Sequence, residues 1–397
     1  MAGRRVLLVV AAAVAVLVPA APAPAAPVVA PAGWAVATSE ALAPGVEHAV
    51  LRRSDPAQEV HVARLAAGSG TRLAPVPAGS GLGALERTSA LCARVNCVVA
   101  VNGDFWDANA RPVGALVAGG ELLTTPALAH VHLTFGGDGS PALRHGLAWS
   151  ATVATLDGHR LAAGAVNRPT GGDGVTIYTR RWGPTTGTPA GTAEVSLDLV
   201  LPSPSALPTG TSAVRAGPAT TAGNTAIGPN QVVVAGTGSG AAAVSALAAR
   251  AAGFLGGLGT LTVDLAGVQA AIGGSPLLLH NGSVAYPADN PDAFTQDRHA
   301  RTLVGVTGTG ELLLVTVDAT DTSAGMSLRE ASELMSGLGA AHAMNLDGGG
   351  STTFVTAGQV RNRPAHGERP VVSALALLPQ PADPLAALLD SLLGGRS

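Results

Sequence analysis

The sequence contains no lysine, so its 23 basic residues are all arginines, and only 26 of its 397 residues are acidic. Charged residues make up 12% of the chain, against about 25% in an average globular protein. The formal net charge is −3 and no long run of one sign occurs, which excludes a basic nucleic-acid arm and electrostatic attachment to an anionic membrane. Aromatic residues are also scarce at 3%, but the apolar fraction of 47% is ample for a sizeable core, and the length allows about two domains.

Long hydrophobic runs are scarce as well, and the clearest stands at the N-terminus. Arg4 and Arg5 precede an apolar run of 13 residues at 6–18, whereas a membrane-spanning helix needs about 20. Ala23-Pro24-Ala25 then offers the small-x-small pattern of a signal peptidase site. The sequence therefore predicts a signal peptide at 1–26, a Pro/Ala-rich linker at 27–43 and a secreted or extracytoplasmic protein; an uncleaved anchor is the alternative.

Only two cysteines occur, Cys92 and Cys97, and no Cys-x-x-Cys motif. An oxidising compartment favours a disulfide between them, with two buried free thiols as the alternative. Neither cysteine has an activating base next to it in the sequence, which argues against thiol chemistry.

The apolar patterns predict more strands than helices. Strands are expected at residues 60–65, 97–101, 195–201, 231–235, 261–265, 312–317 and 371–378, and a hairpin at 277–279 and 284–286. Helices are expected at 82–95, 241–255 and 327–337, the last with a capping box formed by Ser327 and Glu330. This irregular order favours an α+β fold with mixed, mostly antiparallel sheets. We expect one domain at 44–378 with a β-rich insertion at about 126–225, and a C-terminal tail at 379–397.

The segment 345–353, Asn-Leu-Asp-Gly-Gly-Gly-Ser-Thr-Thr, is the strongest candidate for a functional site. Three consecutive glycines are useful where the backbone takes positive φ or where a ligand approaches it closely, and their amides can bind phosphate or carboxylate oxygens. Asp347 could act there as an acid, a base, a nucleophile or a metal ligand. The alternative is an ordinary Asp-Gly hairpin turn.

Three other places carry candidate polar groups. The segment 102–107 combines Asn102, Asp104 and two aromatic residues at a strand end, which suits sugar recognition, although a turn next to core aromatics is an equal alternative. Arg301 would offer a planar, permanently charged fork to a phosphate, or form a surface ion pair. Asp318 ends a predicted strand and could be a turn residue or a site carboxylate.

In their order along the chain, these segments resemble the phosphodiester glycosidase family. The family pattern consists of Asn-Gly-x-Phe-Phe, Arg-Thr-x-x-Gly, a strand ending in Asp, Gly-x-Ser-x-x-Glu and Asn-x-Asp-Gly-Gly-Gly-Ser, which here correspond to residues 102–106, 301–305, 312–318, 325–330 and 345–351. Residues 178–183 are similar to a segment of longer bacterial members, and Asn362 with Glu368-Arg369 resembles the last family block. Trp106 departs from the pattern because it replaces the second phenylalanine.

The resemblance implies hydrolysis at the anomeric carbon of an N-acetylglucosamine-like sugar-1-phosphodiester, with release of the sugar and a phosphomonoester. The catalytic residues would be Asp347 or Asp318, which would activate water or stabilise the oxocarbenium-like centre, and Arg301, which would stabilise the phosphate. The substrate-binding residues would be Asn102, Asp104, Asn345, Gly348, Gly349, Gly350 and Ser351.

The implied partner is a glycosyl phosphodiester or a glycan of the cell envelope or of an exopolysaccharide, with no nucleic acid and no transmembrane helix in the mature chain. The sequence requires no cofactor, and a divalent cation such as Ca²⁺ near the carboxylates is an open alternative that no ligand spacing demands. The rival function is a non-catalytic exported glycan-binding protein. A calcium-dependent structural wall protein is disfavoured because repeats are absent.

Overall fold

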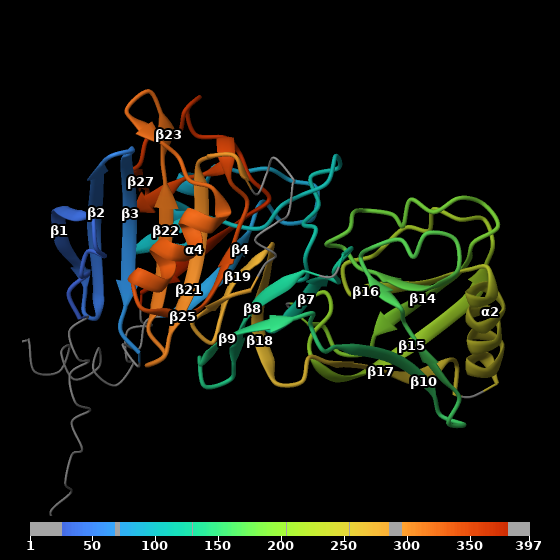
Figure 1. The fold of residues 1–397 in the computed structure, drawn as a ribbon. Helices are drawn as coiled ribbons and strands as arrows, with labels where there is room; N and C mark the ends of the chain where they lie inside the picture. The colour runs from blue at the N-terminus through green and yellow to red at the C-terminus, as the bar shows by residue number, and fades with distance from the viewer. Residues whose placement is uncertain are drawn as a thin grey trace, which may run out of the picture.

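The computed structural model describes residues 26–67, 72–128, 130–203, 205–253, 255–285 and 296–379. The predicted signal peptide and the C-terminal tail lie, but for Ala26 and Pro379, outside these residues. The described chain forms four larger β-sheets, with helices α1 (Thr88–Arg94), α2 (Ser239–Ala252) and α4 (Leu328–Gly337) packed against them (Figure 1). The expected α+β class with mostly antiparallel sheets is confirmed. None of the described helices is long and apolar enough to cross a membrane.

The first sheet, called the main sheet below, has eight antiparallel strands. In spatial order they are β1 (Ala35–Ala43), β2 (Val46–Ser54), β3 (Ala57–Leu65), β22 (Leu312–Val317), β21 (Arg301–Thr307), β25 (Ala340–Asn345), β19 (Leu277–His280) and β20 (Ser283–Val284). The continuous apolar pattern of 312–317 predicts burial, and β22 is indeed an interior strand between β3 and β21. Helix α4 packs on this sheet, with its predicted capping box between Ser327 and Glu330 in place.

A second, small sheet lies next to the main sheet and shares a hydrophobic core with it. Its five strands are β27 (Gln359–Val360), β26 (Phe354–Thr356), β5 (Val99–Asn102), β28 (Ser373–Leu378) and β4 (Arg72–Pro77). Leu375 and Phe354 both pair with Val101, which places β5 between β26 and β28. The shared core explains why β5 and β28 are almost continuously apolar.

Helix α1 covers the small sheet and is shorter than predicted. The sequence predicts a helix from residue 82, but α1 begins at Thr88 because Gly83 takes a φ of +88° and Glu86 instead bridges to Val371. At its C-terminal end, Cys92 and Cys97 form a disulfide, with their Cα atoms 4.9 Å apart.

A middle sheet and a distal sheet extend the molecule to one side (Figure 1). The middle sheet contains β7 (Glu121–Thr124), β6 (Leu116–Ala118), β18 (Val268–Gly274), β8 (Val131–Gly136) and β9 (Pro141–His145). The distal sheet contains β11 (Arg160–Ala162), β10 (Ser150–Thr155), β17 (Leu258–Asp264), β15 (Gly210–Thr220), β14 (Ala193–Leu199), β16 (Gln231–Thr237), β13 (Gly174–Tyr178) and β12 (Ala165–Val166). Helix α2 packs its buried face, including Val244 and Leu247, on the distal sheet.

The strands of the distal sheet run from Ser150 to Asp264, so the predicted insertion at 126–225 overlaps this unit without matching its limits. The insertion is predicted from residues 126–225 because this stretch is rich in Gly, Thr and Pro. The later elements β16, α2 and β17 have ordinary apolar patterns, which is why composition alone does not assign them to the same sheet.

Candidate active site

The predicted Asp-Gly-Gly-Gly loop lies at the boundary between the main sheet and the small sheet. It follows β25, and the backbone N–H of Leu346 donates to the Thr302 carbonyl oxygen at 2.8 Å. One residue later, the N–H of Asp347 donates to the Gly103 carbonyl oxygen at 3.1 Å. The Asn102 side chain donates from Nδ2 to the Asp347 carbonyl oxygen at 2.6 Å. The end of β5 and the start of β21, far apart in the sequence, therefore fix the backbone of Leu346 and Asp347.

The three glycines of the loop are required for different reasons. A Cβ on Gly348 would lie 2.7 Å from the Ala300 carbonyl oxygen, so a side chain would push the loop away from β21. Gly349 has a φ of +57°, which favours glycine, and its N–H donates to the same Ala300 oxygen at 2.8 Å. Gly350 faces Arg369, with 3.7 Å between a built Cβ and the guanidinium. The Gly349 amide is thus already engaged with the protein backbone, although amides of such a glycine run can bind phosphate oxygens.

The Asp347 carboxylate lies beside Arg369, a residue that the sequence analysis did not place in the site. Arg369 Nη2 is 3.2 Å from Asp347 Oδ2, and the exposed fractions of the two side chains are 47% and 14%. Burial raises the pKa of Asp347, and the hydrogen bond to Ser351 and the charge of Arg369 partly counteract that rise. The site therefore pairs a mostly buried carboxylate with a guanidinium that is about half open to solvent.

Arg369 is held in place by two neighbours. Its Nε donates to Ser351 Oγ at 3.0 Å, and its Nη2 donates to the same hydroxyl. The guanidinium carbon lies 4.8 Å from the centre of the Trp106 ring, within the range of a cation–π interaction. The Trp106 ring thus packs against Arg369, an arginine of the protein itself.

Asp104 lies close enough to Asp347 for its negative charge to raise the pKa of Asp347 further. Its own side chain is only 1% exposed. Oδ1 accepts from the N–H of Phe105 at 2.8 Å, and Oδ2 accepts from the N–H of Gly114 at 2.6 Å. The structure therefore uses Asp104 to hold the loop 104–114, whereas the resemblance implied contact with the sugar.

Asn102 and Asn345 are fully buried, which also differs from the expected sugar contacts. Asn102 Oδ1 accepts from the Thr302 hydroxyl at 2.6 Å and from the Thr353 N–H at 3.2 Å, so its side chain joins three segments. Asn345 donates from Nδ2 to the Ser275 carbonyl oxygen at 2.8 Å. Both asparagines position the Asp347 loop from within the protein.

Arg301 is fully buried and does not present its guanidinium to solvent. Its Nε donates to the Met326 carbonyl oxygen at 2.9 Å, and its Nη2 donates to the Asp297 carbonyl oxygen at 3.0 Å. Both faces of β21 are covered, and these two backbone oxygens help to satisfy the charge of the arginine at its start. The structure thus corrects the expected role of Arg301 as an exposed phosphate fork, and Arg369 is the arginine that lies against Asp347.

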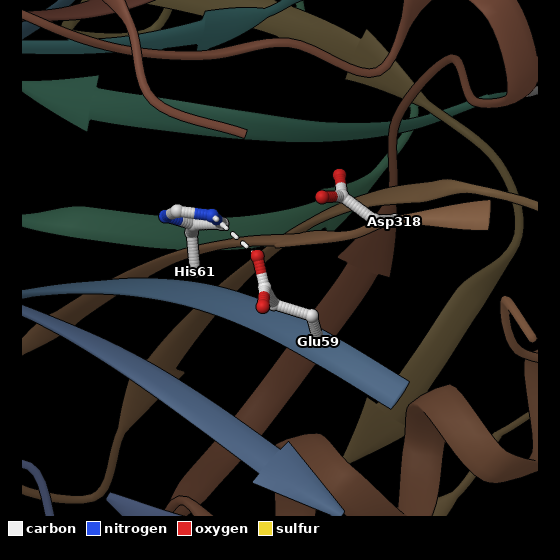
Figure 2. Close-up of side chains that lie close together, drawn as sticks. All are labelled: Glu59, His61 and Asp318. Atoms are coloured by element: carbon white, nitrogen blue, oxygen red, sulfur yellow. Dashed lines mark ion pairs between the residues drawn. The ribbon is translucent and has the colours of Figure 1, made fainter. Parts of the chain in front are cut away.

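Asp318 belongs to a separate cluster. Its side chain is 2% exposed, and burial raises its pKa. Oδ1 accepts from Asn362 Nδ2 and Oδ2 accepts from the N–H of Arg363, each at 2.9 Å. Asn362 Nδ2 also donates to the Thr352 carbonyl oxygen, next to Ser351. Asp318 and Asp347 are therefore linked only indirectly, through the loop that carries Ser351. The Asp318 carboxylate lies near His61 and Glu59 (Figure 2).

The sequence contained one signal that could have identified Arg369, namely the Glu368-Arg369 pair quoted as the last family block. The Glu368 carboxylate accepts from the N–H and the hydroxyl of Ser89 at 2.7 and 2.6 Å, at the beginning of α1. This anchor fixes the backbone next to Arg369. Without a structure, an arginine in such a polar segment is indistinguishable from a solvated surface residue.

Residues 209–378 match the sequence profile of the phosphodiester glycosidase family. The matching segment includes Asp347, Ser351 and Arg369, whereas Asn102 and Asp104 precede it. The family resemblance predicted from the motifs is thereby confirmed for this part of the chain. No protein of curated function is similar enough to count as a relative.

Two of the solved structures that resemble this chain share most of its fold. A hypothetical protein from Synechocystis is 24% identical with a TM-score of 0.64; the likeness covers 84% of this chain but only 61% of that one. The "putative exported protein" of Burkholderia pseudomallei is 24% identical with a TM-score of 0.59, covering 81% and 74% of the two chains. At these identities the likeness shows a shared fold. The catalytic domain of zebrafish N-acetylglucosamine-1-phosphodiester alpha-N-acetylglucosaminidase gives 14% identity and a TM-score of 0.48, covering 87% of each chain.

Proposed function

We propose, from the premise that residues 209–378 belong to the phosphodiester glycosidase family, that this chain is an exported hydrolase of sugar-1-phosphodiesters. It would cleave the bond between the anomeric carbon and the phosphate oxygen of an N-acetylglucosamine-like substrate. The observation that carries the proposal is the pairing of the Asp347 carboxylate with the half-exposed guanidinium of Arg369 inside the matched segment.

Arg369 is suited to bind the phosphate of such a substrate. A guanidinium offers planar, permanently charged donors that match phosphate oxygens. Ser351 and Trp106 orient this group, which reduces the entropy lost when it binds an anion. As the glycosidic bond breaks, negative charge accumulates on the departing phosphate, and the cation stabilises it most at that stage.

Asp347 is suited to act on the sugar side of the same bond. A phosphomonoester is a good leaving group, so the reaction needs little acid catalysis. An ionised carboxylate can activate water or stabilise the positive charge that develops at the anomeric carbon. The proximity of Arg369 favours the ionised form, which this role requires.

Two features support export. The N-terminal pattern of Arg4, Arg5 and an apolar run is typical of a signal peptide. The disulfide between Cys92 and Cys97 is of the kind that persists in oxidising compartments. A cell-envelope or exopolysaccharide glycan phosphodiester is consistent with that location.

The proposal is tested with the chain beginning at Ala26, incubated with a panel of glycosyl-1-phosphodiesters that includes N-acetylglucosamine-1-phosphodiesters. Mass spectrometry measures free sugar and phosphomonoester. We expect both products in equal amounts from at least one substrate, and at least about 100-fold slower release from the Asp347→Asn variant. If no substrate is cleaved while the protein retains a glycan polymer, the chain is a glycan-binding protein and the proposal fails.

A further inference from the structure

We propose that Glu59, His61 and Asp318 form a binding site for a divalent transition-metal ion, separate from the Asp347 site. One potential ligand atom from each side chain lies within 4.8 Å of the other two, and Figure 2 shows the three side chains converging. Glu59 and His61 are two residues apart on β3, so both project from the same face of the main sheet. Asp318 directly follows β22, whose last residue Val317 pairs with Val60 between them.

His61 provides the strongest evidence for a ligand at this place. Its side chain is buried, with an exposed fraction of 4%, yet its Nε2 atom has no hydrogen-bond partner among the described residues. This nitrogen points toward the carboxylates and lies 3.9 Å from Glu59 Oε1, too far for a hydrogen bond. A buried nitrogen of this kind requires a partner, and a cation between the three side chains would supply it.

The hydrogen bonds behind His61 determine which of its nitrogens carries the proton. His48 Nδ1 lies 3.0 Å from Glu40 Oε1, and because an ionised carboxylate only accepts, His48 must donate from Nδ1. In neutral His48 the other nitrogen, Nε2, is then an acceptor, and it lies 3.1 Å from His61 Nδ1. His61 therefore donates from Nδ1, which leaves a lone pair on Nε2. The result is a carboxylate–histidine–histidine chain that orients a metal-ligating nitrogen.

The two carboxylates are also held so that ligand atoms remain available. Arg52 Nε donates to Glu59 Oε2 at 2.8 Å, which leaves Oε1 directed at His61. Asp318 accepts one hydrogen bond on each oxygen, and a carboxylate oxygen can accept more than one interaction. When both carboxylates are ionised, Arg52 balances part of their charge, and a divalent cation between the three ligand atoms, which lie within 4.8 Å of one another, would balance the rest.

The ligand set indicates the class of metal. One imidazole nitrogen with two carboxylates favours ions such as Zn²⁺ or Mn²⁺, whereas Ca²⁺ and Mg²⁺ prefer oxygen ligands alone. Such an ion would join β3 to the end of β22. Because Asp318 accepts hydrogen bonds from Asn362 and Arg363, the ion would also stabilise this segment, in which Asn362 contacts Thr352. The inferred role is therefore to stabilise this region, and it does not depend on the proposed hydrolysis.

The test uses tag-free protein beginning at Ala26, stripped with a chelator and titrated with ZnCl2 or MnCl2 in an isothermal calorimeter. We expect one ion of at least one of the two metals per chain, and a higher melting temperature when it is bound. Glu59→Gln and His61→Gln should weaken binding at least tenfold, and His48→Phe about 10- to 100-fold through loss of the orienting hydrogen bond.

The matched control is His280→Gln, a histidine at the end of β19 that contacts His342. It should bind the metal as the unaltered chain does. Circular dichroism establishes that each variant is folded, and Glu59→Gln is the mildest change because Glu59 is partly exposed. Absence of metal binding at millimolar concentration, or equal binding by folded Glu59→Gln and the unaltered chain, would overturn the proposal.

Discussion

At the residue scale, the reactivity of the candidate site depends on how the charge of Asp347 is balanced. Burial raises its pKa, and Asp104 raises it further, whereas Ser351 and Arg369 lower it. The Asp347 carboxylate thus lies near the negative charge of Asp104, which is part of the fold, and near the positive charge of Arg369, which a bound substrate phosphate would also contact. This balance gives two predictions.

The first prediction concerns Asp347→Asn, which removes the carboxylate and preserves its size. We expect the turnover rate to fall about 100- to 10,000-fold, the range for loss of a general base. Because the folded-state pKa of Asp347 is raised, its ionisation lowers stability as the pH rises through that pKa. At pH 7 the Asp347→Asn variant should therefore be at least as stable as the unaltered chain, with a urea unfolding midpoint that is equal or higher. Asp321→Asn, at an exposed turn, is the control, and equal activity of the two variants would remove Asp347 from the mechanism.

The second prediction concerns the pH profile of kcat/KM. If Asp347 acts in its ionised form, activity falls as the pH decreases through its pKa. Arg369→Gln removes a charge that lowers this pKa, so the acidic limb should move to higher pH, in addition to a lower rate. Arg329→Gln removes an arginine from an exposed ion pair and should leave the limb in place. A limb that stays fixed or moves to lower pH in Arg369→Gln would contradict the assignment.

The sequence marks Asp347 as a candidate site residue more clearly than it marks the arginine beside it. Asp347 stands within a glycine run whose backbone demands are visible in the residue types. Arg301 and Arg369 both occur in short polar segments, and only the fold shows that Arg301 is buried and donates to the Met326 carbonyl oxygen while Arg369 is half exposed. Burial of an individual side chain depends on elements distant in the sequence, so residue type and spacing could not distinguish the two.

At the element scale, the Asp-Gly-Gly-Gly loop is held at a fixed distance from β21. Gly348 leaves no room for a Cβ beside the carbonyl oxygen of Ala300, the residue before β21, and Gly349 donates its N–H to the same atom. The following residues form a short 3₁₀ helix, Gly349–Ser351, that presents the Ser351 hydroxyl to Arg369. The position of the site thus depends on the close approach of two backbones.

A pair of glycine variants tests this dependence. In Gly348→Ala the new Cβ would lie 2.7 Å from a backbone oxygen, so the loop must shift, and a displacement of about 1 Å typically costs about 100-fold in rate. Gly350→Ala adds the same methyl group with 3.7 Å of room, at ordinary contact distance from Arg369. We expect kcat/KM to fall strongly in the first variant and to remain within a few-fold in the second. Comparable losses in both would mean that the approach to β21 does not position the site.

Several elements could be predicted well because their signals are local. The capping box of Ser327 and Glu330 fixed the start of α4, and the Asn281-Gly282 pair fixed the turn between β19 and β20. The start of α1 was not predicted correctly, because the bridge between Glu86 and Val371 involves a strand-like partner from the other end of the chain.

At the scale of the whole molecule, the distal and middle sheets share a hydrophobic core and are also linked by an ion pair whose carboxylate is buried. Arg181, after β13, donates from Nε and Nη2 to the carboxylate of Glu121 on β7, at 3.0 and 2.7 Å. Glu121 is 4% exposed, and the N–H of Ala206 also donates to it. This contact ties the segment 178–183, which resembles longer bacterial family members, to the middle sheet.

Arg181→Gln should therefore reduce the free energy of unfolding by about 1–3 kcal/mol, because it leaves the buried Glu121 without its cation. Arg329→Gln, which breaks an exposed ion pair with Glu333, should change it by less than about 0.5 kcal/mol. Urea unfolding followed by tryptophan fluorescence measures both values. Equal effects of the two substitutions would show that the Arg181–Glu121 pair does not stabilise the arrangement of the sheets.

The fold class could be predicted from the sequence, but the way in which the main sheet and the small sheet pack together could not. Period-two and continuous apolar patterns indicate strands such as β3 and β22 locally. The site arises because β5 and β25 end, and β21 begins, near one another, which places Asn102, Thr302 and Asp347 in contact across the two sheets. Only the ordered family motifs indicated that these segments belong together, and export remains a prediction because the signal segment lies outside the described residues.

The central claim is that the chain cleaves a carbon–oxygen bond of a sugar-1-phosphodiester. The most direct test is to run the reaction in ¹⁸O-labelled water and to locate the label by mass spectrometry. Attack at the anomeric carbon places ¹⁸O in the released sugar and leaves the phosphomonoester unlabelled, which is the predicted result. Label in the phosphomonoester would show attack at phosphorus and would contradict the account.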